Sequence, residues 1–337
     1  MTTSVQNADP TFRDALLLFK NEAAALHEIG PSLETTVTPP EPPRVVNSDV
    51  IESTTVREHR IVDPPIVGID AFLDGKQESR IVHHDDGVPI VYGRVAAVVR
   101  QRVLRRMVTW KRPVCRSRLY VPRDLVRPTL WMHVADSGLD VMDTTESSSA
   151  ERSSDWASGD PHPFTIAQRA VDAVKRDREI AERQLAEDWC TTRQEILFID
   201  GSIAGSDRVA TAPNAIGVIK SHRTLYVTGP ALRVVQSLPL NHRSSVIRVD
   251  AYHRTPVASW YLRIRDSAGH DPMWGLLRVE IAMPDKSASK QATADRANLV
   301  SRWILAELMP LSLPDSQWDK MLYGIRDCDE FLRTLRA

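Results

Sequence analysis

Apolar and polar residues follow two patterns along the chain, one typical of helices and the other typical of strands. Apolar residues recur at helical spacing over 11–29, from about Pro163 to Trp189, and near 292–308 and 315–335. Shorter apolar runs predict strands at 65–70, 196–200, 215–220, 224–227, 245–250, 259–265 and 274–282, and the alternation over 79–102 around Gly87 and Gly93 predicts a hairpin. Strands on both sides of a long helix predict an α/β domain around a mixed sheet.

Local composition divides the chain into three parts. Residues 1–60 combine the N-terminal helix with a proline-rich stretch, which predicts an extended linker. Residues 61–310 form the main domain, and within it 136–162 are rich in Ser, Asp, Glu, Gly and Pro, which predicts a mobile insertion. Residues 311–337 supply a C-terminal helix.

The overall composition excludes several classes of protein. The chain has 337 residues, of which 42% are hydrophobic and 26% are charged, as in ordinary globular proteins. No apolar stretch approaches the roughly 18 residues of a membrane span, and the N-terminus has no signal-peptide pattern. Cys115, Cys190 and Cys328 lie far apart, which argues against a zinc ribbon or a disulfide framework. We therefore expect a cytoplasmic protein without membrane association.

Charge is balanced in total but separated along the chain. The 43 basic residues nearly equal the 44 acidic ones, yet Arg94–Arg127 holds eleven basic residues and one acid. Arginine suits bidentate contacts to phosphate, so this segment predicts a DNA-binding surface on which Trp110 and Tyr120 stack on bases. The alternative is a solvated face whose arginine stems cover apolar surface. The DNA-binding candidates are Arg100, Arg102, Arg105, Arg106, Lys111 and Arg112.

Acidic residues follow this basic segment directly. Residues 133–160 hold seven acids and one arginine. A weaker hypothesis is that this acidic stretch masks the basic surface when DNA is absent.

Asp70 and Asp200 each end a short apolar run, and ligands of open α/β sheets bind at the carboxyl ends of strands. If the two strands are neighbours, the carboxylates repel each other unless a proton or a cation lies between them. Oxygen ligands suit Mg²⁺ or Mn²⁺, and two such ions about 4 Å apart clamp both sides of an in-line phosphodiester displacement. The alternative is that each aspartate only starts a turn, as Asp200-Gly201-Ser202 readily does.

A glutamate of the long helix is the third candidate ligand. Glu182 borders the apolar stripe that contains Leu185 and Trp189, whereas Glu179 falls on the more polar face. A carboxylate beside the buried stripe can reach inward to the edge of the sheet, so we favour Glu182 over Glu179.

Several segments resemble the NurA family of nucleases, whose domain is a variant of the ribonuclease H fold. The resemblance covers about residues 60–310 and lies in the order and spacing of short motifs. These are VGIDAFLDG (67–75), ILFIDGSIAGSDRVATAPNAIGVIKSHRTLYV (196–227), SWYLRI (259–264), LLRVEI (276–281) and ADRANLVSRWIL (294–305).

The resemblance implies a metal-dependent deoxyribonuclease that uses two Mn²⁺ or Mg²⁺ ions. It assigns Asp70, Glu182 and Asp200 as metal ligands and Lys220 as the lysine that ends a GxxK strand. It also implies a HerA-type hexameric ATPase that translocates DNA as a partner, a homodimer, and a role in DNA end processing or in defence against foreign DNA.

The sequence departs from the family pattern at two places. The family has a Gly–Ser type pair after the first aspartate, where Ala71 and Phe72 stand here. It also has a Tyr and a His before the late helix, where this chain has neither, and Asp295 stands near the place of the histidine. Asp295 is either a fourth metal carboxylate or a first-turn aspartate favoured by the helix dipole.

These departures keep a second function open, that of a DNA-binding or scaffold subunit of an ATPase complex with weakened catalysis. His83-His84-Asp85-Asp86 resembles a metal cluster in composition. Neighbouring strand residues point to opposite faces, however, so we expect a polar hairpin end there.

Overall fold

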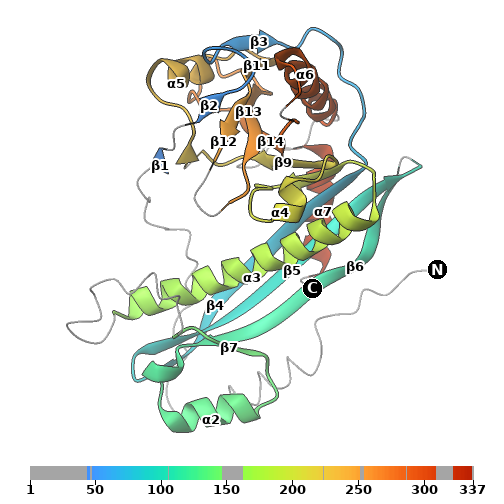
Figure 1. Ribbon diagram of the computed structural model, residues 1–337. Helices are drawn as coiled ribbons and strands as arrows, with labels where there is room; N and C mark the ends of the chain where they lie inside the picture. Colours follow the sequence, from blue (N-terminus) through green and yellow to red (C-terminus); the bar gives the residue numbers. More distant parts are fainter. Residues whose placement is uncertain are drawn as a thin grey trace.

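The computed structural model of the protein describes residues 44–45, 48–104, 106–145, 162–222, 224–250, 254–285, 287–308 and 322–335. The described part is a mixed α/β fold in which a large twisted sheet of about twelve strands packs against helices (Figure 1). Within these ranges, no helix combines the length and the apolar content needed to span a membrane.

The sheet brings together strands that lie far apart in the sequence. Its order is β2-β12-β13-β14-β9-β8-β4-β5-β6-β7, with β11 pairing to β13 and β3 pairing to β11. The pairs β4–β8, β8–β9 and β6–β7 are parallel, and the other pairs are antiparallel. The strands are β2 (Asp49–Val50), β3 (Glu58–Arg60), β4 (Ala71–Asp85), β5 (Val88–Val103), β6 (Arg106–Val121), β7 (Val141–Asp143), β8 (Leu197–Asp200), β9 (Ala215–Ile219), β11 (His242–Ser244), β12 (Ile247–Val249), β13 (Val257–Arg263) and β14 (Leu276–Ala282), while β1 (Arg44–Val45) and β10 (Thr224–Leu225) form a separate pair.

The helices cover the sheet on both faces. The long helix α3 (Pro163–Thr192) packs on β4 and β5, while α6 (Lys290–Ala306) and α7 (Tyr323–Thr334) pack on the opposite face. The shorter segments are η1 (Arg123–Leu125), α2 (Pro128–Asp136), α4 (Asp207–Ala210) and α5 (Gly229–Gln236). Strand alternation produces the two cores, because Ala71 and Leu73 join the core under α3 and Phe72 joins the core under α6 and α7.

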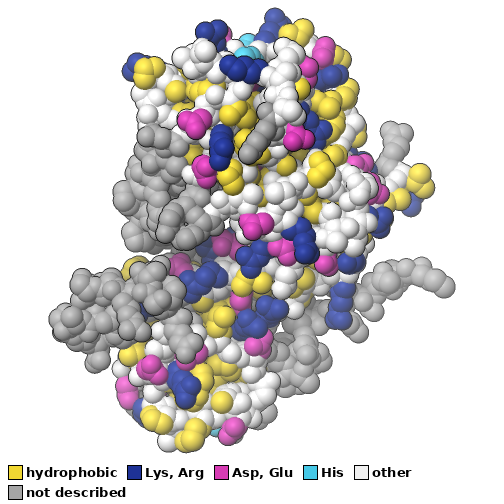
Figure 2. Space-filling view, in the orientation of Figure 1, with side chains coloured by type: hydrophobic (Ala, Val, Ile, Leu, Met, Phe, Trp, Pro, Cys, Tyr) yellow, Lys and Arg dark blue, Asp and Glu magenta, His cyan; other side chains and the backbone are white. Residues whose placement is uncertain are grey.

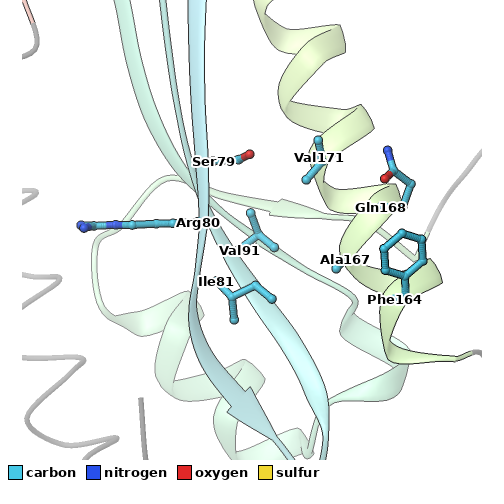
Figure 3. A pocket seen from close by; sticks show the side chains of 8 residues that line it. All are labelled: Ser79, Arg80, Ile81, Val91, Phe164, Ala167, Gln168 and Val171. Atoms are coloured by element: carbon cyan, nitrogen blue, oxygen red, sulfur yellow. The ribbon is translucent and has the colours of Figure 1, made fainter. Parts of the chain in front are cut away.

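The first turns of α3 show the same alternation at close range (Figure 3). Ser79 and Ile81 of β4 point toward α3, whereas Arg80 points to the other side of the strand. The cavity between these residues and α3 measures about 10 Å³. That volume holds no more than about one water molecule, so this region is packing and not a ligand site.

Most of the predicted elements are present. The predicted helix 163–189 is α3, the run 196–200 is β8, and the run 274–282 contains β14. The predicted hairpin is longer than expected, because β4 begins at Ala71 and not at residue 79. Its turn lies at Asp86 and Gly87, which have positive φ angles, whereas Gly93 lies inside β5 where Val174 and Tyr120 leave no room for a Cβ atom.

Three expectations about the organisation need correction. Residues 65–70 are not a strand, because Pro64 and Pro65 prevent regular pairing and β4 starts only after Asp70. The segment expected as a linker contains β2 and β3, which belong to the large sheet. The expected mobile insertion begins with ordered residues, since β7 pairs with β6. Residues 146–161, the predicted helix 11–29, and 315–321 of the predicted C-terminal helix lie outside the described residues.

Candidate functional site

The parallel pairing of β4 with β8 brings two aspartates together. Leu73 of β4 is in register with Ile199 of β8, so the next residues along both strands are Asp74 and Asp200. Both side chains extend from the sheet face that carries Phe72 and Phe198. Asp200 is the last residue of β8 and therefore lies at the carboxyl end of that strand, the end at which α/β sheets bind ligands.

Glu182 of α3 approaches the same place from the helix side. A Cβ atom added to Gly75, which follows Asp74, would lie 2.3 Å from Glu182 Oε1. The glycine therefore allows the Glu182 carboxylate to rest against the β4 backbone beside Asp74. The choice of Glu182 over Glu179 from helical phase agrees with this geometry, because the Glu182 side chain is 13% exposed and that of Glu179 is 52% exposed.

Two cations compensate these carboxylates. The Lys220 ammonium, just after β9, lies 2.7 Å from Asp200 Oδ2. Arg178, one turn before Glu182 on α3, forms an ion pair with the Glu182 carboxylate and also donates a hydrogen bond to Gln77. We call Asp74, Glu182 and Asp200 the carboxylate cluster, and its position explains why β8, β9 and α3 all carry a charged residue at this point.

Proximity and burial change the proton affinities of the cluster. Burial, with the neighbouring Asp200 charge, raises the pKa of Asp74 to about 7. Burial also raises the pKa of Glu182 to about 7, although Arg178 opposes the shift. Burial alone would lower the pKa of Lys220, but the Asp200 carboxylate outweighs this and raises it. Near neutral pH the cluster therefore binds protons that a divalent cation could replace.

A cleft of about 370 Å³ opens beside the cluster. On the face drawn in Figure 2, Lys and Arg side chains lie beside Asp and Glu side chains across the middle of the molecule, where Figure 1 shows α3. The cleft is large enough for a small ligand or a nucleotide-sized part of a longer one. It is lined by Arg178, Glu179, Glu182, Arg183, Ala186, Ile199, Asp200, Gly201, Ser202, Ile203, Gly205, Ser206, Val209 and Arg254.

Asp70 does not join the carboxylate cluster, contrary to the expectation from sequence. It precedes β4, and its Oδ2 atom accepts a hydrogen bond from the Ile196 backbone N–H at 2.9 Å, just before β8 begins. Four residues separate Asp70 from Asp74, which corresponds to about 13 Å along an extended strand. Asp74 takes the place that the sequence assigned to Asp70, and the signal that marks it is an aspartate followed by Gly75 within one apolar-to-polar strand.

Asp295 also lies away from the cluster. It belongs to the first turns of α6, where its Oδ1 atom accepts a hydrogen bond from Gln291 and where Arg296 bonds to the Pro213 carbonyl. Pro213 is at the end of the sheet where β8 and β9 begin, opposite to Asp200. A different carboxylate, Asp329 of α7, lies close enough to contribute to the raised pKa of Lys220.

The structure corrects the interpretation of the basic segment at four positions. The guanidinium of Arg100 bonds Asp327 of α7 at 2.7 Å, and that of Arg102 makes a bidentate pair with Glu307. Both arginines thus stabilise the fold, because their acidic partners come from the C-terminal part of the chain. The two aromatic residues expected to stack on bases are buried, since Trp110 packs edge-on against Trp189 and the Tyr120 hydroxyl bonds Asp177.

The remaining basic candidates lie on or beside β6. Arg106 and Arg112 are exposed, and Lys111 is exposed while pairing with Asp188 at 3.0 Å. Arg105 lies outside the described residues. An exposed ion pair such as Lys111–Asp188 is weak, so all three described side chains can reach a phosphate.

His83-His84-Asp85-Asp86 forms the end of the β4–β5 hairpin, as expected. Asp85 is buried and accepts hydrogen bonds from the backbone and side chain of Arg127, while burial lowers the pKa of His83. These contacts fix the hairpin end to the segment before α2.

The described residues hold no group of three or more His, Cys, Asp or Glu side chains arranged to bind a metal ion as they stand. The chemistry of the carboxylate cluster nevertheless fits a hard divalent cation, because it offers oxygen ligands whose charges repel one another. In the conformation described, Lys220 and Arg178 take the place of such a cation.

Comparison with known proteins identifies no relative of this chain. No family model matches the sequence, and no curated protein is significantly similar to it.

Proposed function

We propose that this protein is a metal-dependent nuclease that hydrolyses phosphodiester bonds of DNA at the carboxylate cluster. The observation that carries the proposal is the register of β4 and β8, which sets Asp74 beside Asp200 while Glu182 reaches the same point over Gly75. Three carboxylates from three separate elements, next to a cleft, require a compensating positive charge. Divalent cations supply it in enzymes that transfer phosphoryl groups.

Asp74, Glu182 and Asp200 would hold Mg²⁺ or Mn²⁺, which activates water and neutralises the charge that develops on the phosphodiester. For this the carboxylates must exchange their present partners, so Lys220 and Arg178 are released toward the substrate. The Lys220 ammonium, 2.7 Å from Asp200, is then placed to neutralise a non-bridging phosphate oxygen. Arg183 and Arg254 line the cleft and are placed to contact neighbouring phosphates.

The resemblance to NurA nucleases supports the same proposal. With Asp74 as the first-strand aspartate, Gly75 supplies the glycine that the family has after it, and this removes part of the departure noted at Ala71 and Phe72. A ribonuclease H-like core is in keeping with a mixed sheet whose central parallel strands carry the acids. The HerA-type ATPase, the homodimer and the role in end processing or defence rest on the resemblance alone.

The test is cleavage of end-labelled linear DNA by the purified full chain with Mn²⁺, and with EDTA as the blank. We expect cleavage by the wild type, its loss in Asp200→Asn and Glu182→Gln, and its retention in Glu179→Gln. Glu179 is the matched control because it lies on the same helix and lines the same cleft. Equal activity of Glu182→Gln and wild type would disprove the assignment of the cluster.

A second candidate function is a DNA-binding scaffold subunit with weak or no catalysis. It is favoured by the ion pairs of Lys220 and Arg178, which hold the carboxylates in an arrangement that does not bind a metal as it stands. The two candidates differ in Mn²⁺ binding, which isothermal titration measures without any activity. Saturable Mn²⁺ binding that Asp200→Asn removes supports the nuclease, and DNA binding without Mn²⁺ binding supports the scaffold.

A further inference from the structure

A second cavity, of about 440 Å³, lies at the other end of the sheet. It opens where β8 and β9 begin, where β14 ends and where α6 starts, so β8 separates it from the carboxylate cluster. Its volume is within the range of small-molecule sites. It is lined by Gln194, Ile196, Pro213, Asn214, Val246, Ala258, Ile281, Ala282, Met283, Pro284, Ala288, Ala292, Thr293 and Arg296.

The walls of this cavity are mostly apolar, and most of its polar groups are already used. The Asn214 amide donates hydrogen bonds to the carbonyls of Arg193 and Glu195. The Thr293 hydroxyl donates to the Ser289 carbonyl within α6. An apolar ligand group therefore finds a favourable surface here, and these two side chains have little left to offer a polar one.

Arg296 is the exception among the lining residues. Its guanidinium donates to the Pro213 carbonyl at 3.0 Å and lies over the Trp303 ring at 5.0 Å. Burial lowers its pKa, and among the described residues no carboxylate offsets this effect. The neighbouring Asp295 carboxylate accepts a hydrogen bond from Gln291 instead of pairing with it. A half-buried cation without an anionic partner favours a ligand that brings the anion.

We propose that this cavity binds a small anion with an apolar chain, of which an aliphatic carboxylate is the simplest form. The carboxylate would pair with Arg296, and the chain would occupy the apolar space between Ile196, Val246 and Ile281. A guanidinium has five N–H donors in a planar fork that matches a carboxylate, and only one of those of Arg296 has an acceptor among the described residues.

Isothermal titration of the full chain with hexanoate in EDTA tests the proposal independently of any metal or nuclease activity. We expect saturable one-to-one binding that Arg296→Gln weakens at least tenfold. Arg302→Gln is the matched control, because Arg302 lies on the same helix but bonds the Pro64 carbonyl away from the cavity. Ala292→Trp, at an exposed position on the rim, should block the cavity without disturbing the core.

Two further ligands separate charge from chain length. Hexanol lacks the carboxylate and acetate lacks the chain, so both should bind at least tenfold more weakly than hexanoate. Equal binding of hexanol and hexanoate, unchanged affinity in Arg296→Gln, or no saturable binding of hexanoate would overturn the proposal. Binding of an acidic peptide but not of hexanoate would also overturn it and assign the cavity to a protein partner. Asp200→Asn should bind hexanoate as the wild type does, even if the proposed nuclease function is wrong.

Discussion

The two ends of the β4–β8 strand pair contain the same residue type in opposite surroundings. Asp70 lies where β8 begins, and its carboxylate accepts a backbone hydrogen bond from Ile196. Asp74 lies where β8 ends, next to Asp200 and near Glu182 and Lys220. The first carboxylate ties two segments together, whereas the second belongs to a group of charges that compete for protons and cations.

This difference shows that the register between strands determines what a carboxylate can do. A one-residue shift between β4 and β8 would turn Asp74 to the other face of the sheet relative to Asp200. The chemical capacity of the cluster is therefore a property of the pairing, and substitutions at its two ends test that statement directly.

The largest expected effect is the contrast between Asp74→Asn and Asp70→Asn in DNA cleavage. Removal of a metal-binding carboxylate should lower the cleavage rate with Mn²⁺ by more than about 100-fold, because even outer-shell partners cost about 10–100-fold. Asp70→Asn should stay within about threefold, since the amide oxygen still accepts the Ile196 hydrogen bond. A larger loss in Asp70→Asn than in Asp74→Asn would restore the assignment made from sequence.

The sequence predicts the long elements well and the contacts between them poorly. The helix α3 and the strand β8 follow from strong periodicity and flanking signals, and the helical phase correctly places Glu182 nearer the sheet than Glu179. Asp74 is missed because an isolated apolar run before Asp70 looks like a strand. The pairing that makes Asp74 a neighbour of Asp200 is a long-range contact that no local pattern contains.

The same limit explains the basic segment. Within Arg94–Arg127 there is one acid, so local counting predicts uncompensated arginines. The compensating acids, Asp327 and Glu307, come from more than 200 residues further along the chain. Arg296 shows the reverse case, because its neighbour Asp295 is adjacent in sequence yet makes its hydrogen bond with Gln291.

A second and smaller effect is expected at Gly75. Gly75→Ala places a methyl group 2.3 Å from Glu182 Oε1, and the flexible end of Glu182 must move away. A displacement of about 1 Å at a catalytic group costs up to about 100-fold in rate. Cleavage should therefore fall by about 10- to 100-fold while the melting temperature changes little, as circular dichroism measures.

Gly205→Ala is the control for this substitution. Gly205 lines the same cleft, and a Cβ atom there meets nothing within 4 Å. Full activity in Gly75→Ala, or an equal loss in both variants, would show that Glu182 does not need its position over Gly75.

A third effect concerns stability against pH in the absence of metal. The pKa of Asp74 in the folded protein is about 7, above its ordinary value of 3.8, so the folded state binds this proton more tightly than the unfolded state. The resulting stabilisation is complete below about pH 4 and is lost as the pH rises through about 7. Asp74→Asn removes the ionisation, so its melting temperature should match the wild type at pH 5 and exceed it at pH 8.5.

The expected rise is a few degrees, since 1 kcal/mol corresponds to about 2–4 °C for a domain of 150–250 residues. Scanning calorimetry in EDTA at the two pH values measures it, with Glu179→Gln as an exposed control. A melting temperature of Asp74→Asn that differs from the wild type equally at both pH values would contradict the buried, repelled state of Asp74.

The smallest effect separates two kinds of arginine within the basic segment. Arg106 and Arg112 are exposed, so their double replacement by Gln should weaken DNA binding several-fold and lower the salt slope of log K by about 2. Arg100→Gln should instead lower the free energy of unfolding by about 1–3 kcal/mol, because it leaves Asp327 without its charge-assisted partner. Fluorescence anisotropy at several salt concentrations and urea unfolding measure the two effects. If Arg100→Gln changed the salt slope as much as the double variant, the ion pair with Asp327 would not hold Arg100 away from DNA, and the whole segment would act as one phosphate-binding surface.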